Sequence, residues 1–166
     1  RFISPNVDPE FFDSGADSAG ADAGSRAPDV TRAGGAARGA EDDAERGAGP
    51  GADIVDKPLV VDGVTYRVTF VDVGNPHCVI LVDDPAGFDV SGVGSLIERH
   101  DAFPNRINVE FVRVESDGSA RMRVWERGVG ETQACGTGAT AVGAALVRLG
   151  LASSPVLVRL LGGELT

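Results

Sequence analysis

The chain has 166 residues, a formal net charge of -10 and a pI near 4.5. This length allows one domain with a hydrophobic core, although two smaller lobes would also fit. The acidic charge argues against nucleic acid or an anionic membrane as a partner, because both require basic patches. Two cysteines cannot form a dense disulfide framework, no Cys-His cluster has zinc spacing, and no apolar run could span a bilayer. We therefore expect a cytoplasmic protein without a metal site.

The amino-terminal third has an unusual composition. Residues 13–53 consist almost entirely of Gly, Ala, Asp, Ser, Glu and Arg, with Val30 as the exception among large apolar residues. Such a segment cannot bury enough surface to offset the entropy of ordering it, so we expect a disordered insertion. Residues 1–12 include Phe11 and Phe12, which are apolar enough to pack at the edge of a fold.

From Ile54 onward the sequence predicts regular structure. Residues 60–73 alternate and are rich in β-branched side chains, and Asp62-Gly63 within them predicts a hairpin turn. A turn at Gly74-Asn75-Pro76 precedes another strand over residues 77–82. Apolar spacing over residues 88–100 predicts a short helix despite its glycines.

The carboxy-terminal half continues the alternation. Residues 107–115 and 120–125 predict two strands joined by the tight turn of residues 116–119. Small apolar residues after Cys135 predict a long helix that ends at Gly150, and residues 156–161 predict a further strand. We therefore expect an α+β fold in which a β-sheet wraps around one long helix.

The clearest functional signal is the stretch from Glu126 to Ala139, ERGVGETQACGTGA. It places Cys135 where a glycine-rich loop becomes a helix. The free N–H groups of a first helical turn stabilise anions, so this position favours a thiolate and offers a cradle for a carboxylate. Thr137 and Arg127 add further donors. The alternative is that Cys135 is a small core residue at an ordinary helix cap.

Three motifs, residues 74–79 (GNPHCV), residues 103–111 (FPNRINVEF) and residues 126–139, together resemble diaminopimelate epimerase. The resemblance covers residues 54–166 well and residues 1–12 weakly. It implies two similar lobes, each a barrel-like β-sheet around a central helix, with the active site between them. Residues 54–166 would be the carboxy-terminal catalytic lobe, truncated at its end, and residues 1–12 an edge of the preceding lobe.

The resemblance also implies a reaction. Members of this family interconvert LL- and meso-2,6-diaminopimelate, in lysine biosynthesis, without a cofactor. Without pyridoxal phosphate there is no electron sink, so fixed dipoles must stabilise the carbanion-like transition state. One thiolate removes the α-proton and a thiol on the opposite face returns one.

Site residues carry over by motif. Cys135 resembles one of the two catalytic thiols, and His77 would assist proton transfer or orientation. Substrate binding would involve Asn75 and Asn108 as amide contacts, Gly136 and Thr137 as donors to the α-carboxylate, and Glu126 with Arg127 as a clamp on the charged ends, Glu126 also counting among the catalytic groups.

Three other residues look structural. Cys78 follows His77 in a strand and should point to the opposite face, into the core. His100 is expected to cap the preceding helix, whose carboxyl end favours a cation. Trp125 is expected to anchor the core.

The chain departs from the family pattern in one respect, because the motif that carries the family's other catalytic thiol is absent from it. We therefore expect a fragment that is inactive alone and part of a homodimer when complete, and the other explanation is a split or degenerate protein that must pair with the missing lobe. Alternatives are a proline racemase-like or phenazine-biosynthesis-like isomerase of the same fold, or a non-catalytic amino acid-binding module.

Overall fold

The computed structural model describes residues 6–13 and 54–166. The expectation for the low-complexity segment, residues 13–53, therefore lies almost entirely outside the described residues, and of residues 1–12 the first five lie outside them. The last residues before the gap form the short helix α1 (Pro9–Asp13). The remainder is an α+β fold, which confirms the expected fold class.

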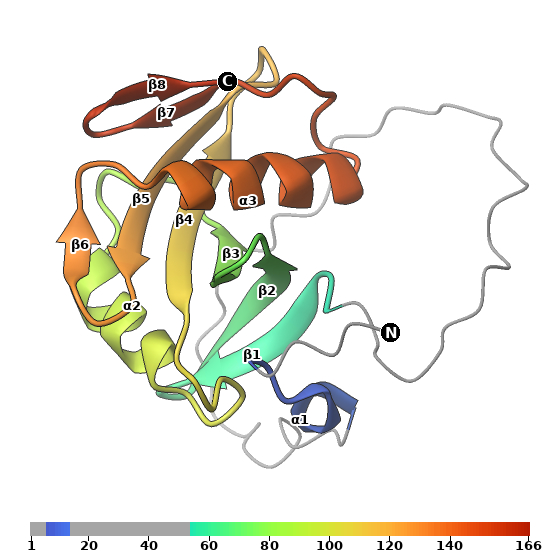
Figure 1. The fold of residues 1–166 in the computed structure, drawn as a ribbon, viewed down its shortest axis with the longest axis vertical. Helices are drawn as coiled ribbons and strands as arrows, with labels where there is room; N and C mark the ends of the chain where they lie inside the picture. Colours follow the sequence, from blue (N-terminus) through green and yellow to red (C-terminus); the bar gives the residue numbers. More distant parts are fainter. Residues whose placement is uncertain (1–5, 14–53) are drawn as a thin grey trace, which may run out of the picture.

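Eight strands form one mixed sheet, drawn in Figure 1. They are β1 (Lys57–Val61), β2 (Val64–Asp72), β3 (Pro76–Leu81), β4 (Asn108–Val114), β5 (Ala120–Glu126), β6 (Gly130–Thr132), β7 (Val158–Leu160) and β8 (Gly163–Leu165). The order is β1-β2-β3-β4-β5-β7-β8, with β6 paired to β5. The β3–β4 and β5–β7 pairs are parallel and the other pairs are antiparallel. The predicted hairpins at Asp62-Gly63 and at residues 116–119 are confirmed.

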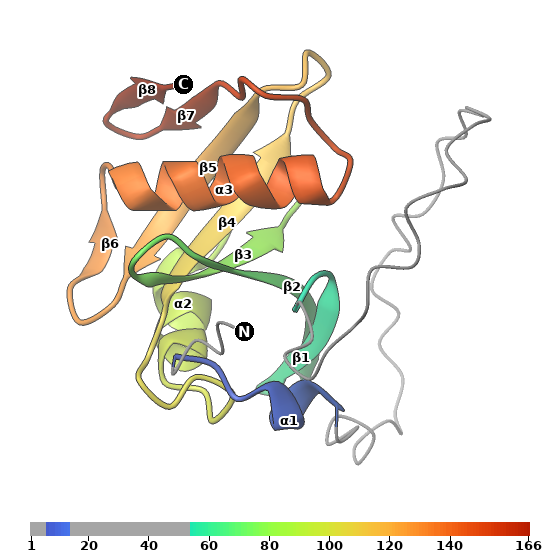
Figure 2. The same ribbon diagram turned by 45° about the vertical axis from the view of Figure 1, so that its right-hand side comes forward.

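The central strands β3 and β4 are mostly buried, and Figure 2 shows a helix on each side of the sheet. Helix α3 (Gly136–Arg148) packs on one face, together with Val79 of β3 and Val112 of β4. Helix α2 (Val90–Glu98) packs with the opposite face, where Cys78 and Phe111 lie. Successive strand residues point to opposite faces, so β3 and β4 contribute to both cores. Cys78 thus lies in the core away from its neighbour His77, as expected.

Helix α2 forms despite its glycines because both have structural reasons. The Asp89 side chain caps the helix by accepting a hydrogen bond from the amide of Gly92, with an N···O distance of 2.9 Å. A Cβ atom on Gly94 would lie 2.7 Å from the Cβ of Trp125. A side chain at this point would force α2 away from β5. Trp125 packs against the core, as expected for an anchor.

His100 does not play the expected role. Its ring Nε2 donates to the carbonyl of Val60 in β1 at 3.1 Å, and its Nδ1 accepts from the amide of Ala102 at 3.2 Å. The backbone turns away after α2, so the ring reaches a strand rather than the helix carbonyls. The capping prediction is wrong, and His100 instead ties the 100–102 turn to the sheet.

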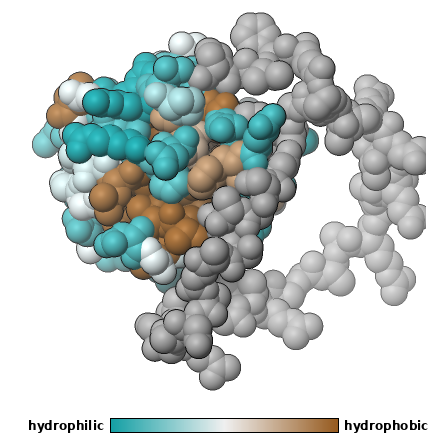
Figure 3. All heavy atoms as spheres, turned by 90° about the horizontal axis from the view of Figure 1, so that it is seen from below, coloured by the Kyte–Doolittle hydropathy of each residue, from teal (hydrophilic) through white to brown (hydrophobic). Residues whose placement is uncertain are grey.

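Apolar side chains gather on the face seen in Figure 3, which views the molecule from below the orientation of Figure 1. At this end of the fold, Phe11 and Phe12 of α1 pack against the core on the α2 face of the sheet. The Phe11 ring contacts the His100 ring, and the Phe12 ring contacts the Phe103 ring. These two residues do pack at an edge of the fold. Among the described residues, no helix is long and apolar enough to cross a membrane.

Candidate active site

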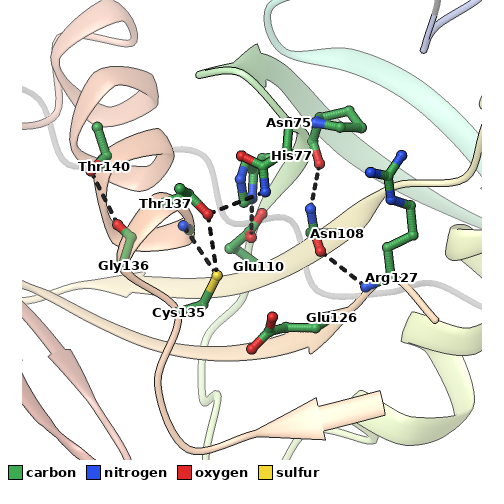
Figure 4. A network of polar contacts seen from close by, with 12 residues as sticks. Asn75, His77, Asn108, Glu110, Glu126, Arg127, Cys135, Gly136, Thr137 and Thr140 are labelled. Carbon is green, nitrogen blue, oxygen red and sulfur yellow. Dashed lines mark hydrogen bonds and ion pairs between the residues drawn. The ribbon is translucent and has the colours of Figure 1, made fainter. Parts of the chain in front are cut away.

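The topology brings the predicted site residues to one end of the sheet. Strands β3 and β4 run parallel and therefore begin side by side, while β5 runs antiparallel to β4 and ends there. Asn75 precedes β3, Asn108 begins β4, Glu126 ends β5, and Cys135 precedes α3. Figure 4 shows these side chains around a common space. Residues far apart in the sequence thus form one polar cluster.

Cys135 is the N-cap residue of α3, as its sequence context predicts. Its backbone is extended (φ -142°, ψ 107°), and its Sγ accepts a hydrogen bond from the amide of Gly138 at 3.3 Å. The Sγ also lies 3.5 Å from the hydroxyl oxygen of Thr137. The thiol is 8% exposed, whereas Gly136 and Thr137 are exposed. The Sγ therefore lies against the amide groups of the first turn of α3, the end of the helix that carries partial positive charge.

His77 pairs with a carboxyl group that the sequence analysis did not single out. The His77 Nδ1 lies 2.6 Å from the Oε1 of Glu110, and both side chains are 0% exposed. In the β3–β4 register His77 lies opposite Asn108, so Glu110 is two residues farther along the same face. A glutamate within the apolar run of residues 107–112 is the sequence signal that could have revealed this pair.

Burial dominates the electrostatics of this pair. It raises the pKa of Glu110, and the Glu126 carboxylate raises it further, while the contact with His77 partly offsets both effects. The pKa of the neighbouring Cys78 thiol is also raised well above its usual value, by burial first and then by the charge of Glu110. Cys78 is therefore an inert core thiol.

The start of α3 sits directly on the buried pair. A Cβ atom on Gly138 would lie 2.9 Å from Glu110 Oε1 and 3.2 Å from Cys135 Sγ. Real Cβ contacts are essentially never shorter than 3.0 Å, so a glycine is required for this approach. Gly138 therefore allows the Glu110 carboxyl group of β4 to approach the first turn of α3, next to the Cys135 thiol and its amide donor.

The two predicted asparagines tie separate segments together. Asn75 Nδ2 donates to the hydroxyl oxygen of Thr137 at 3.2 Å and so links the loop before β3 to α3. Asn108 Nδ2 donates to the carbonyl of Pro76 at 2.8 Å, and its Oδ1 accepts from the amide of Arg127 at 2.9 Å. Both residues lie at the site, and both make contacts within the protein.

Glu126 and Arg127 lie at the site but point in different directions, as Figure 4 shows. Glu126 Oε1 accepts from the hydroxyl of Thr132 at 2.5 Å. The Arg127 guanidinium donates from Nη1 to the carbonyl of Asn105 at 3.1 Å. The expected clamp is therefore two separate groups, one anionic and one cationic, on the two sides of Asn108.

A second unpredicted glutamate holds the turn that carries Arg127. Glu98, 2% exposed at the end of α2, accepts hydrogen bonds from Trp125 Nε1 at 2.8 Å and from the Gly128 amide at 2.9 Å. Burial alone would raise its pKa, but these two bonds and the charges of Arg106 and Arg99 outweigh burial and leave the pKa lowered. Glu98 is thus an ionised anchor for the 126–129 turn.

A groove of about 790 Å³ lies between α3 and the 154–158 segment, with Leu165 at its rim. It shares Gly136 with the candidate site, but its lining includes neither Cys135 nor His77. Among the described residues, no group of three or more His, Cys, Asp or Glu side chains is placed to hold a metal ion.

Comparison with known proteins identifies the family. The chain is 49% identical over 118 residues to diaminopimelate epimerase from Moorella thermoacetica and 51% identical over 113 residues to that from Magnetococcus marinus. These matches cover 71% and 68% of this chain but 42% and 41% of the relatives, so the chain spans less than half of their length.

Two solved structures have lower similarity. A putative phenazine biosynthesis PhzC/PhzF protein from Clostridium difficile is 20% identical, with a TM-score of 0.41 over 60% of this chain and 38% of that one. A phenazine biosynthesis protein of the PhzF family from Bacillus anthracis is 23% identical, with a TM-score of 0.42 over 60% and 32%. The family model described as diaminopimelate epimerase matches residues 69–166, which include all the predicted site residues. The chain therefore belongs to the diaminopimelate epimerase family.

Proposed function

We propose that this chain supplies one thiol half of a cofactor-independent active site that interconverts LL- and meso-2,6-diaminopimelate. The observation that carries the proposal is the placement of Cys135, whose Sγ caps α3 and accepts the Gly138 amide. Membership of the family supplies the reaction class. The acid and the base are then both thiols. One is Cys135 of this chain, and the other belongs to a motif that this sequence does not contain.

The proposed reaction inverts one α-carbon. A thiolate removes the α-proton from one face and becomes a thiol, while the opposing thiol delivers its proton to the other face and becomes the thiolate. Charge that develops on the substrate α-carboxylate is stabilised by donors already in place. Because thiol protons exchange with water, a product formed in D₂O carries solvent deuterium at the inverted carbon.

The geometry supports specific binding roles. The exposed first turn of α3 at Gly136 and Thr137 offers backbone N–H groups to a carboxylate. Arg127 provides a cation and Glu126 an anion at the same end of the sheet, which suits the zwitterionic ends of a diamino acid. Asn75 and Asn108 keep the loops that bear these groups at a fixed separation and add amide contacts to the substrate.

The proposal includes an organisation of the whole protein. Residues 54–166 form the carboxy-terminal catalytic lobe, and residues 1–12 belong to an edge of the preceding lobe. The second thiol lies in that preceding lobe, so this chain alone does not invert diaminopimelate. The complete protein is a cytoplasmic homodimer of the lysine pathway that acts on this small amino acid and binds no nucleic acid.

A chimera tests the proposal. The segment of the Moorella thermoacetica relative that this chain matches is replaced by the matching residues of this chain, and the product is incubated with each diaminopimelate isomer in D₂O. We expect inversion with deuterium at the α-carbon, and its loss in Cys135→Ser. The isolated chain, assayed in parallel, should produce neither isomer from the other.

The alternatives predict other outcomes of the same assay. Inversion that survives Cys135→Ser in the chimera, or steady inversion by the isolated chain, would contradict the two-thiol proposal. Inversion of proline in place of diaminopimelate would favour a racemase. Binding of diaminopimelate without deuterium incorporation, unchanged by Cys135→Ser, would favour a non-catalytic binding module. Circular dichroism of each variant confirms that it is folded.

A further inference from the structure

The pair of His77 and Glu110 is more completely buried than proton transfer at an open site would require. Both side chains are 0% exposed, and one carboxyl oxygen and one ring nitrogen contact each other at 2.6 Å. The remaining atoms, His77 Nε2 and Glu110 Oε2, have no hydrogen-bond partner among the described residues. A buried polar atom without a partner costs about 1–3 kcal/mol, so its presence calls for a functional reason.

The proton content of the pair follows from its burial. An isolated buried carboxylate is costly, which is why burial raises the pKa of Glu110. The pair avoids this cost if it holds one shared proton and is neutral overall. The shared proton then lies on Nδ1, beside a carboxylate, or on the carboxyl group, which donates to Nδ1. In both arrangements Nε2 carries a hydrogen.

Three ionisable groups surround the pair. Glu126 approaches from β5, and its negative charge favours proton retention by Glu110. Cys135 approaches from the start of α3, where the Gly138 backbone packs against Glu110 Oε1. Cys78 lies on the opposite face of β3, and its raised pKa leaves it uncharged. Each of these neighbours is therefore an acid, and His77 provides the basic group of the cluster.

We propose that Glu110 is a positioning residue for His77. The Glu110 carboxyl group binds Nδ1 of His77 and thereby keeps a proton on Nε2. The Nε2–H group of His77 is then a hydrogen-bond donor for an anionic oxygen or sulfur. The parallel β3–β4 register holds the two residues in place, and Gly138 packs against Glu110. The role of the His77 Nε2–H group as a donor beside Cys135 adds a residue role to the proposed function and rests on that function. The state of the pair can nevertheless be measured without substrate.

Nuclear magnetic resonance of the full chain labelled with ¹⁵N-histidine tests the proposal. The sequence has two histidines, so His100→Gln assigns the signals of His77. We expect the His77 Nε2 at pH 7 to give the signal of a protonated nitrogen, with the Nδ1 in a strong hydrogen bond. An unprotonated Nε2 in the wild-type chain would overturn the proposal, whatever the activity of the chimera.

Glu110→Gln separates positioning from simple packing. Glutamine has nearly the same shape, but its amide can either accept from Nδ1 or donate to it, so the ring is no longer held in one state. We expect Nε2 to become unprotonated in a measurable part of the molecules, because each amide orientation selects one tautomer. Glu115→Gln, at the far end of β4, is the matched control and should keep the wild-type signal.

Failure of the variant to fold does not remove the test, because the wild-type spectrum alone decides the state of Nε2. If Glu110→Gln folds and His77 keeps a fully protonated Nε2, Glu110 has no positioning role. If the expected change appears but the chimera does not invert diaminopimelate, the pair is as proposed and the proposed function fails.

Discussion

Replacement of Gly138 by alanine should leave the fold less stable than the same replacement at Gly143, which should stabilise it. Both residues lie in α3, where alanine is favoured over glycine by about 1 kcal/mol. A Cβ atom at Gly143 would meet its nearest neighbour, Val156 Cβ, at 3.9 Å, an ordinary van der Waals contact. At Gly138 it would lie 2.9 Å from Glu110 Oε1.

The steric cost at Gly138 cannot be relieved by a simple side-chain movement. Glu110 is fully buried and held by His77 at 2.6 Å, and on its other side the new Cβ would lie 3.2 Å from Cys135 Sγ. Overpacking of this kind costs about 1–3 kcal/mol. The difference between the free energies of unfolding of the two variants therefore contains this steric cost, together with the difference in helix propensity between the first turn and the interior of α3.

Urea denaturation monitored by circular dichroism measures that difference. Gly143→Ala should raise the midpoint and Gly138→Ala should lower it relative to Gly143→Ala, with similar slopes if both unfold in one step. The rate of Cys135 alkylation provides a second measurement, because the Gly138 amide binds the thiol. A Gly138→Ala protein as stable as Gly143→Ala, with unchanged alkylation, would refute the close approach of α3 to Glu110.

Three further predictions concern the surroundings of the site. Glu98→Gln should lower the free energy of unfolding by about 1–3 kcal/mol, because either Trp125 Nε1 or the Gly128 amide, both donors to the buried Glu98 carboxyl group, loses its acceptor. Since the pKa of Glu98 is lowered in the fold, its stabilisation is present above the ordinary carboxyl pKa of about 4.3 and lost as the pH falls through the lowered value. Urea midpoints between pH 6 and 3 should therefore fall less steeply in Glu98→Gln, and parallel curves would contradict this. Gly94→Ala should destabilise by about 1–3 kcal/mol in the same assay, because the new Cβ would lie 2.7 Å from Trp125, and a neutral result would count against that contact. Asn108→Ala should cost about 1–3 kcal/mol by freeing a carbonyl and an amide, and a change under 0.5 kcal/mol would show that these bonds are not made in solution.

Local signals in the sequence were sufficient to predict much of the fold. Asp62-Gly63 and the turn at residues 116–119 predict hairpins because the turn chemistry is encoded within a few residues. The position of Cys135 at the start of α3 could also be predicted from nearby sequence, since a cap residue and the small residues that follow it define a helix start. The resemblance to the family then selected the residues that the sheet gathers at one end.

Long-range pairings explain what the sequence did not reveal. Glu110 lies 33 residues from His77, and their contact depends on the register of two parallel strands. Glu98 lies 30 residues from Gly128, at the end of a helix whose orientation is set by contact with Trp125. The apolar neighbours of Glu110 mark it as a candidate buried acid, but they do not name its partner. Glu98 could not be separated from ordinary surface acids by pattern alone.

The two buried glutamates show how one side chain serves opposite purposes at the same site. Glu98 receives two N–H donors and lies near arginines, so its ionised form is favoured and it fixes the 126–129 turn. Glu110 is fully buried, contacts one histidine and faces another carboxylate, so its pKa is raised. Exchanging these environments would place a bare anion against the thiol and leave the turn without a charged acceptor. The difference in donors therefore lowers the pKa of the carboxyl group that anchors the turn and raises the pKa of the one next to the start of α3.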